Sequence, residues 1–331
     1  MLRDYLEITR LFNMGLTAVA PVLGALSMWD IGSLSLPELC ILFIIGSLAH
    51  IYGFVINDVI DIKVDKLSKE LSARPLVRGS ITRRRAAFFA ISCMVGSFLL
   101  SLIFFSEFFD YISLFFILLI AYFFATIYDV ASKKYPGMDL FVTGAIFFLI
   151  LFGARTIGTP TMLAYIVALI GSLQVLFMNM INGAIKDIDH DKQGSADTIA
   201  IRLGANIHAG VIRLPVSFRT TGYLIEIIRI ILIFLPFVLL DLDPYLWQIV
   251  LLVLLALLTF FSIYKLYCIK TFNRPRIRKM IGIIVIFMYA TTPIMLSSLN
   301  IYIILVALIP PLWFFVSNLV LHKTIFEPKT M

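Results

Sequence analysis

The chain has 331 residues, of which 61% are hydrophobic and 14% are charged, and its mean hydropathy is +1.00. This composition excludes a soluble globular domain, because such domains contain only about 45–50% apolar residues. A formal net charge of +7 would suggest a nucleic-acid partner in a soluble protein. In a membrane protein the basic residues report orientation instead, so we expect no nucleic-acid partner.

Apolar runs of the roughly 20 residues that cross a bilayer recur along the whole chain. We expect ten such runs, at 8–29, 37–57, 86–105, 111–128, 139–157, 162–183, 223–240, 245–268, 280–298 and 301–321. No Ser/Gly-rich linker or low-complexity segment separates them. They therefore predict an all-α, polytopic membrane bundle of nine to ten transmembrane helices, in a single domain over residues 1–331. The run at 301–321 is a possible extra helix, which Pro310-Pro311 is expected to kink or split.

Lys and Arg residues gather on one side of this topology. With the N-terminus placed in the cytoplasm, 25 of the 27 Lys and Arg residues lie on the cytoplasmic side, and only Arg155 and Arg229 do not. This asymmetry predicts a multi-pass protein of the cell membrane with a cytoplasmic N-terminus. The three cytoplasmic loops expected to form the active site are 58–85, 129–138 and 184–222. Arg83-Arg84-Arg85, before the third run, are expected to anchor the chain at the membrane surface.

The second run leads into the acidic segment Asn57-Asp58-Val59-Ile60-Asp61-Ile62-Lys63-Val64-Asp65. If the helix continues through it, Asn57, Asp61 and Asp65 lie at positions i, i+4 and i+8 on one face. Carboxylates are costly at the edge of a lipid-embedded bundle, so they indicate a function.

A second acidic segment, Lys186-Asp187-Ile188-Asp189-His190-Asp191, follows the sixth run and repeats the i, i+4 spacing at Asp187 and Asp191. It aligns with residues 56–66 when Lys186 is treated as an insertion. An even number of predicted helices separates the two segments, so both deliver their acids to the same surface. This arrangement suggests a parallel internal repeat, and chance similarity between two Ile/Asp-rich stretches is the alternative.

Clustered carboxylates with neighbouring basic residues are suited to a metal-bridged diphosphate, because Mg²⁺ joins carboxylate to phosphate oxygens while Lys and Arg neutralise the remaining charge. The candidate metal ligands are Asn57, Asp58, Asp61, Asp65, Asp187, Asp189 and Asp191. The candidate diphosphate-binding residues are Lys63, Arg74, Arg78, Lys133, Lys134 and Lys186. An ion-coupled secondary transporter that uses the same carboxylates is the alternative, although its acids would be expected at interrupted helices near the midplane.

These residues resemble the UbiA superfamily of intramembrane prenyltransferases. The first segment matches the family's NxxxDxxxD pattern and is followed by Arg74-Pro75-Leu76-Val77-Arg78-Gly79-Ser80-Ile81-Thr82, which is similar to the family's RPLxxGxIS stretch. The second segment matches DxxxD at Asp187 and Asp191. Arg10-Leu11-Phe12-Asn13, and Tyr128 with Lys133 or Lys134, are weaker similarities.

The resemblance implies a bundle around a central cavity, with Mg²⁺ held between the two motifs and a polyprenyl diphosphate, such as geranylgeranyl diphosphate, as donor. The prenyl group would pass through an allylic carbocation-like transition state to a small acceptor, either an aromatic quinone precursor or a glycerol-phosphate-type lipid precursor. We expect Asp65 to remove the acceptor's proton or hold the acceptor, and Tyr128 to face the cation. Asn13 and Asn182 are expected to line the substrate pocket, beside membrane lipid.

The sequence departs from the family pattern in two places. Gly194 follows Asp191 by three positions where the family usually has four, so either Asp189 or Asp191 completes the second motif. The run at 301–321 exceeds the nine helices usual in the family.

Overall fold

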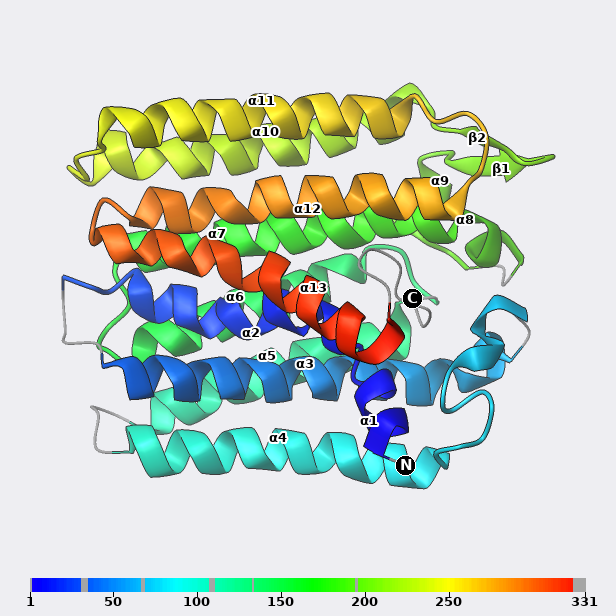
Figure 1. Ribbon diagram of the computed structural model, residues 1–331, viewed down its shortest axis with the longest axis horizontal. Helices are drawn as coiled ribbons and strands as arrows, with labels where there is room; N and C mark the ends of the chain where they lie inside the picture. The colour runs from blue at the N-terminus through cyan, green and yellow to red at the C-terminus, as the bar shows by residue number, and fades with distance from the viewer. Residues whose placement is uncertain are drawn as a thin grey trace.

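The computed structural model describes residues 2–30, 35–66, 69–106, 111–132, 134–193 and 196–323. Its long helices run side by side and form a bundle (Figure 1). Among the described residues, eight helices are long and apolar enough to cross a membrane, or nine if the bent pair α1 and α2 forms one span. The predicted polytopic helical membrane protein is confirmed.

The elements follow one another in chain order with short connections. The first part contains α1 (Leu2–Ile8), α2 (Leu11–Leu26), α3 (Leu36–Asp65), the 3-10 helix η1 (Lys69–Ala73), α4 (Arg83–Phe105), α5 (Tyr111–Ala131) and α6 (Asp139–Arg155). The second part contains α7 (Met162–Phe177), the π-helix η2 (Met178–Gly183), α8 (Ala184–Gln193), α9 (Ile199–Arg202), α10 (Val216–Leu239), α11 (Leu246–Tyr267), α12 (Arg274–Leu296), the 3-10 helix η3 (Ile301–Leu308) and α13 (Ile309–His322).

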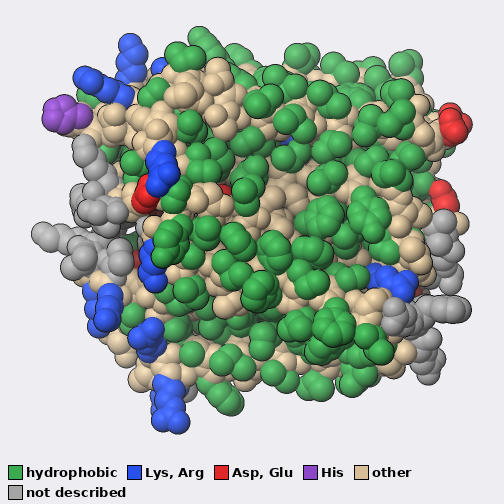
Figure 2. All heavy atoms as spheres, turned by 180° about the vertical axis from the view of Figure 1, so that it is seen from behind, with side chains coloured by type: hydrophobic (Ala, Val, Ile, Leu, Met, Phe, Trp, Pro, Cys, Tyr) green, Lys and Arg blue, Asp and Glu red, His purple; other side chains and the backbone are tan. Residues whose placement is uncertain are grey.

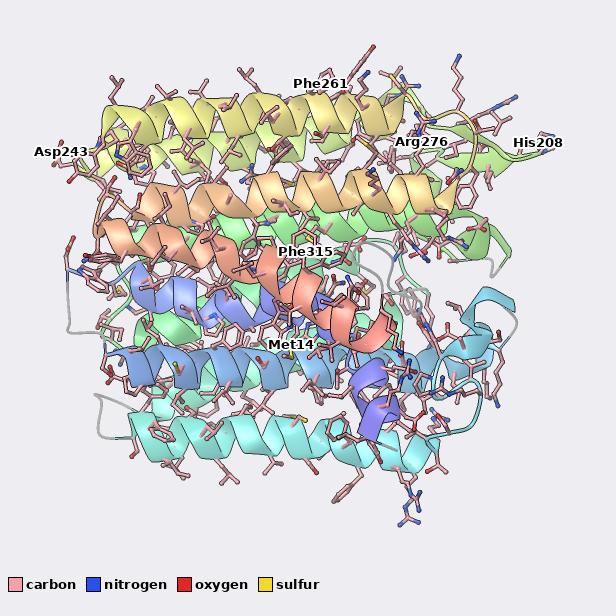
Figure 3. All side chains as sticks on the ribbon, in the orientation of Figure 1. Met14, His208, Asp243, Phe261, Arg276 and Phe315 are labelled. Carbon is pink, nitrogen blue, oxygen red and sulfur yellow. The ribbon has the colours of Figure 1, made fainter. Side chains whose placement is uncertain are left out.

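Both acidic segments are helical and lie at the same end of the bundle, which we call the acidic end. Helix α3 continues to Asp65, so the predicted 58–85 loop begins only after this residue. No Gly or Pro interrupts residues 54–65, and buried Val55 and Val59 keep the helix packed on the core beyond the predicted boundary at residue 57. His208 and Arg276 also lie at this end, whereas Asp243 lies at the opposite end (Figure 3).

The predicted 184–222 loop contains regular structure. Helix α8 extends α7 and η2 through the second acidic segment, and α10 already begins at Val216. Between them, strands β1 (Asn206–His208) and β2 (Val211–Arg213) form an antiparallel hairpin. Its two-residue turn has positive φ at Ala209 (49°) and Gly210 (75°), the conformation that matches the twist of a tight hairpin.

The first predicted run is a broken helix, whereas the last changes helix type along its length. Helices α1 and α2 meet at 59°, so the predicted 8–29 helix begins at Leu11. The 301–321 run changes from the 3-10 helix η3 to α13 just before Pro310-Pro311, but Ile301–Leu321 stays one candidate membrane span. Trp313 fixes α13 on α2 by donating a hydrogen bond from Nε1 to the Leu11 carbonyl at 2.8 Å. Phe315 of α13 and Met14 of α2 both lie midway along the bundle (Figure 3).

Glycines allow α2 and α6 to touch through their backbones. A Cβ atom at Gly24 would lie 1.8 Å from the Ile150 carbonyl oxygen, and one at Gly153 would lie 1.8 Å from the Pro21 carbonyl oxygen. Small residues at such crossings are typical of membrane helices, which gain stability from close packing. Hydrophobic side chains cover the sides of the bundle, while most visible Lys and Arg gather at the acidic end (Figure 2).

A fully buried ion pair within α10 is hydrogen-bonded to α12. Arg229 donates two hydrogen bonds to the Glu226 carboxylate, at 2.8 and 2.7 Å, and both side chains have 0% exposure. The remaining guanidinium nitrogen donates to Thr291 Oγ1 at 2.8 Å. Arg229, one of the two basic residues that break the charge asymmetry, is therefore neutralised inside the bundle.

Candidate active site

The first acidic motif, Asn57, Asp61 and Asp65, lies on one face of α3 together with buried Asp58. Arg74, from the segment after η1, donates hydrogen bonds to Asp65 Oδ2 at 2.7 Å and to Asp58 Oδ1 at 3.3 Å. Arg74, Asp58 and Asp65 all expose 13% or less of their side chains, so these charges compensate one another away from water.

Arg10 is the main residue of this site that the sequence analysis did not select. Its guanidinium donates a hydrogen bond to Asp58 and lies 5.0 Å from the ring centroid of Phe54. Its φ of 47° places it at the bend between α1 and α2, a conformation that costs a non-glycine residue about 1–2 kcal/mol. The Arg10-Leu11-Phe12-Asn13 similarity was the available signal, but it drew attention to Asn13.

The second acidic motif, Asp187 and Asp191, lies on α8. Lys186 forms an ion pair with Asp187 at 3.3 Å. Asp189 instead accepts a hydrogen bond at 2.6 Å from Arg274, the first residue of α12. The π-turn of η2 lies directly before α8, and such turns occur often at functional sites.

The two motifs lie within electrostatic range of common partners. Tyr128 of α5 interacts with the charges of Asp61 from the first motif and Asp191 from the second. Arg10 interacts with the charges of Asp58, Asp65 and Asp187. Residues far apart in the sequence thus converge at the acidic end of the bundle.

Asp129 is a second residue that the sequence analysis missed. It follows Tyr128, is 5% exposed, and lies near the Asn57 side chain. It also lies within range of the Asp61 charge. Its position beside Tyr128 was the available sequence signal. A single Asp that repeats no spacing is, however, hard to distinguish from other acidic residues by sequence alone.

Several buried polar atoms at this site have no hydrogen-bond partner among the described residues. They include the Nε atoms of Arg10 and Arg74, one oxygen of Asp129, and both amide atoms of Asn182, which is only 1% exposed. Leaving such a group unbonded costs about 1–3 kcal/mol, so the site is built to meet further polar atoms. The two arginine donors in particular suit an oxyanion.

The donor set is suited to Mg²⁺, because carboxylate and amide oxygens are the ligands that this ion prefers. Asn57, Asp61, Asp187 and Asp191 would hold it. In the described part of the chain, however, no three His, Cys, Asp or Glu side chains lie close enough together to form a metal cluster. Asp58 and Asp65 are bonded to arginines here.

The remaining predicted residues take different positions. Lys63 and Lys134 are exposed at the acidic end. Arg78 binds Glu7 at 3.0 Å and also Asp4, and so ties the segment after η1 to α1. Lys133 and Gly194 lie outside the described residues. The roles predicted for these residues stay predictions.

A cavity of about 90 Å³ lies inside the bundle between α2, α3, α6, α7 and α12. Asn13 and Phe54 line it together with apolar side chains such as Ile150 and Val167. Gln174 also lines the cavity, is 4% exposed, and has no partner for its Nε2 among the described residues. Asn182 does not line this cavity.

The connection between α8 and α9 carries a surface ion pair. Arg202 donates hydrogen bonds of 2.8 and 2.7 Å to the two oxygens of Asp197. These bonds lower the pKa of Asp197 below its ordinary value. The pair fixes α9 beside the second acidic motif without entering the site.

Comparison with known proteins identifies the family of this fold. The model of the UbiA prenyltransferase family matches residues 18–281, most of the chain. The chain belongs to the UbiA prenyltransferase family. It is therefore a prenyltransferase, and the match includes both acidic motifs and Tyr128.

Individual relatives agree with this membership. The chain is 26% identical over 257 residues to digeranylgeranylglyceryl phosphate synthase of Saccharolobus solfataricus, covering 73% of this chain and 86% of the relative. A solved structure concerned with digeranylgeranylglyceryl phosphate synthase matches with a TM-score of 0.63 and 21% identity, over 92% of this chain and 98% of that one. A UbiA homologue from Archaeoglobus fulgidus bound to GPP and Mg²⁺ matches with a TM-score of 0.63 and 18% identity, over 89% and 99%. At these identities the structural matches show the UbiA fold.

Proposed function

We propose that this chain transfers a polyprenyl group from its diphosphate to a glycerol-phosphate-type lipid acceptor, in a reaction that depends on Mg²⁺. The observation that carries the proposal is the convergence of the two acidic motifs around Tyr128 and Arg10. A transporter that uses the same carboxylates loses its support, because the family is one of prenyltransferases.

The diphosphate would bind between the two motifs. Mg²⁺, when bound, would neutralise the leaving diphosphate and hold it against the carboxylates. Asn57, Asp61, Asp187 and Asp191 are the proposed ligands, because Asp187 and Asp191 repeat the i, i+4 spacing of Asp61 and Asp65. The unbonded Nε donors of Arg10 and Arg74 would supply charge-assisted hydrogen bonds to the phosphate oxygens.

Cleavage of the allylic carbon–oxygen bond leaves positive charge on the prenyl group, and the cavity would stabilise and protect it. Tyr128 is half-buried within electrostatic range of Asp61 and Asp191, where its ring could face the allylic cation. The apolar cavity walls keep water away from the cation and accept the first part of the hydrocarbon chain. Asp65 is the proposed residue that holds the acceptor or removes its proton, which requires release from Arg74.

The acceptor class is supported by the relatives and by the charge at the acidic end. The relative from S. solfataricus is a digeranylgeranylglyceryl phosphate synthase. Exposed Lys63 and Lys134 stand near the site and would attract a phosphate-bearing acceptor. We place this end in the cytoplasm of a cell membrane, on the basis of its Lys and Arg content.

A second candidate acceptor, an aromatic quinone precursor, is favoured by one observation. The unbonded amide of Gln174 in the cavity suits an uncharged oxygen group, which a phenol or quinone carries.

The test uses purified full-length protein, radiolabelled geranylgeranyl diphosphate and Mg²⁺, with glycerol-phosphate-type and phenolic acceptors in parallel. We expect product with the glycerol-phosphate type, and a loss of roughly 100-fold or more for Asp61→Ala and Asp187→Ala. Asp243→Ala, at the opposite end of the bundle, is the control and should keep full activity. Transfer to phenolic acceptors alone would reverse the choice of acceptor, and no transfer with either would refute the proposal.

Asp65→Asn tests the role of this acid separately. We expect it to retain donor binding and to lose turnover, because the amide cannot accept the acceptor's proton. Full turnover of this variant would show that Asp65 has no such role.

A further inference from the structure

A groove of about 570 Å³ lies outside the active site, where α1 crosses the beginning of α4. It is lined by Tyr5 from α1 and by Arg84, Arg85, Phe88, Phe89 and Ser92 from α4. The ring centroids of Tyr5 and Phe89 are 5.1 Å apart in an edge-on contact, which holds the two helices together along the groove. Figure 1 shows α1 beside this end of α4.

The two ends of the groove differ in chemistry. Arg84 and Arg85 provide two positive charges at the acidic end, and no acidic residue of the described part of the chain lines the groove. Phe88 and Phe89 follow one helical turn further into the apolar band. From Arg84 to Ser92 the groove spans eight residues, or about 12 Å of helix. Two arginines followed by two phenylalanine rings match an anionic headgroup followed by the upper part of an acyl chain.

The arginines of the groove are free to bind such a headgroup. Both are exposed, and neither has an ion-pair partner among the described residues, in contrast to Arg10, Arg74 and Arg78 nearby. Phe88, one helical turn from these two arginines, is 73% exposed. An aromatic ring below a pair of arginines is the arrangement expected at the level of lipid headgroups.

We propose that this groove is a binding site for one anionic phospholipid, whose phosphate contacts Arg84 and Arg85 and whose acyl chain lies on Phe88 and Phe89. Because Tyr5 belongs to α1, the bound lipid would also hold α1 against α4. The site is separate from the acidic motifs, so the inference does not rest on the proposed function.

The experiment measures lipid retained by the full-length protein in native mass spectrometry, after reconstitution in mixed phosphatidylglycerol and phosphatidylcholine. We expect wild-type protein to retain one phosphatidylglycerol in preference to phosphatidylcholine. Arg84→Gln with Arg85→Gln should weaken this retention about 30-fold, from about 1 kcal/mol for each basic residue.

The matched control removes the same charge from the same end of the bundle. Arg276 and Lys279 are exposed on α12 and do not line the groove. Arg276→Gln with Lys279→Gln should leave retention unchanged, as should Arg83→Gln on the neighbouring position of α4. Equal losses of lipid retention in the control and groove variants would show a diffuse attraction to the membrane and would contradict the proposed binding site.

Two further arms separate the lipid from other phosphates. Millimolar inorganic phosphate should fail to displace the phosphatidylglycerol, because the acyl chain contributes to binding, and Phe88→Ala should weaken retention. In vesicles of phosphatidylcholine alone, the groove double variant should keep the wild-type KM for the prenyl diphosphate. A raised KM there would assign the groove to substrate entry and overturn the lipid proposal.

Discussion

Replacing Arg229 with leucine should strongly destabilise the bundle, because it leaves the Glu226 carboxylate buried without its partner. Both side chains have 0% exposure, and the guanidinium donates two short hydrogen bonds to the carboxylate and one to Thr291. Removal of one partner of a buried pair costs about 3–5 kcal/mol. At roughly 2–4 °C per kcal/mol, the loss amounts to a fall of about 10 °C in Tm.

The assay is thermal unfolding in detergent at one fixed scan rate, because unfolding of large proteins is often irreversible. The double variant Glu226→Leu/Arg229→Met removes both charges and should recover most of the lost stability, since a buried ion pair replaced by apolar side chains is often neutral or stabilising. Arg219→Leu, on the same helix, is the control: it removes an exposed arginine with one hydrogen bond, to the Leu214 carbonyl at 2.8 Å, and should lower Tm far less than Arg229→Leu. A single variant as stable as the control, or a double variant no better than the single one, would refute the reasoning.

Three further variants test other contacts. Gly153→Ala should cost at least about 1–3 kcal/mol in the same unfolding assay, because its Cβ would lie 1.8 Å from a backbone oxygen of α2, whereas Gly53→Ala has open space and should not destabilise. Arg10→Gln should lower kcat/KM about 10- to 100-fold through a lost charge-assisted hydrogen bond, and an unchanged kcat/KM would remove Arg10 from the site. Trp313→Phe should lower the free energy of unfolding by about 1 kcal/mol, because it removes the 2.8 Å hydrogen bond to the Leu11 carbonyl. An unchanged free energy of unfolding would show that this bond does not stabilise the bundle.

The membrane bundle and the place of both acidic segments could be predicted from the sequence. Apolar run length is fixed by bilayer thickness, and the i, i+4 spacing of Asp187 and Asp191 repeats that of Asp61 and Asp65. Helix ends were harder to place. Hydropathy falls at Asn57, but α3 continues to Asp65, because helical hydrogen bonds and packing at Val59 do not depend on the charge of neighbouring residues.

Long-range partners could not be predicted from spacing. The bond between Arg274 and Asp189 joins residues 85 positions apart, and that between Arg10 and Asp58 joins residues 48 apart. Both arginines are ordinary positive-inside residues in the sequence, so nothing local distinguishes a ligand-facing arginine from a membrane anchor. The hairpin of β1 and β2 was missed for a similar reason, because its strands have only three residues each.

The glycine contacts between α2 and α6 have a consequence for engineering the cavity that we propose to hold the prenyl donor. At Gly24 and Gly153 the two helices touch through their backbones, so they cannot come closer together, and any side chain at these positions would clash with the facing backbone. The width of the cavity on this side is a fixed dimension of the scaffold. Variants selected for longer or shorter prenyl donors should therefore carry their substitutions on α7 and α12, where side chains such as Val167, Gln174 and Thr292 line the opposite walls.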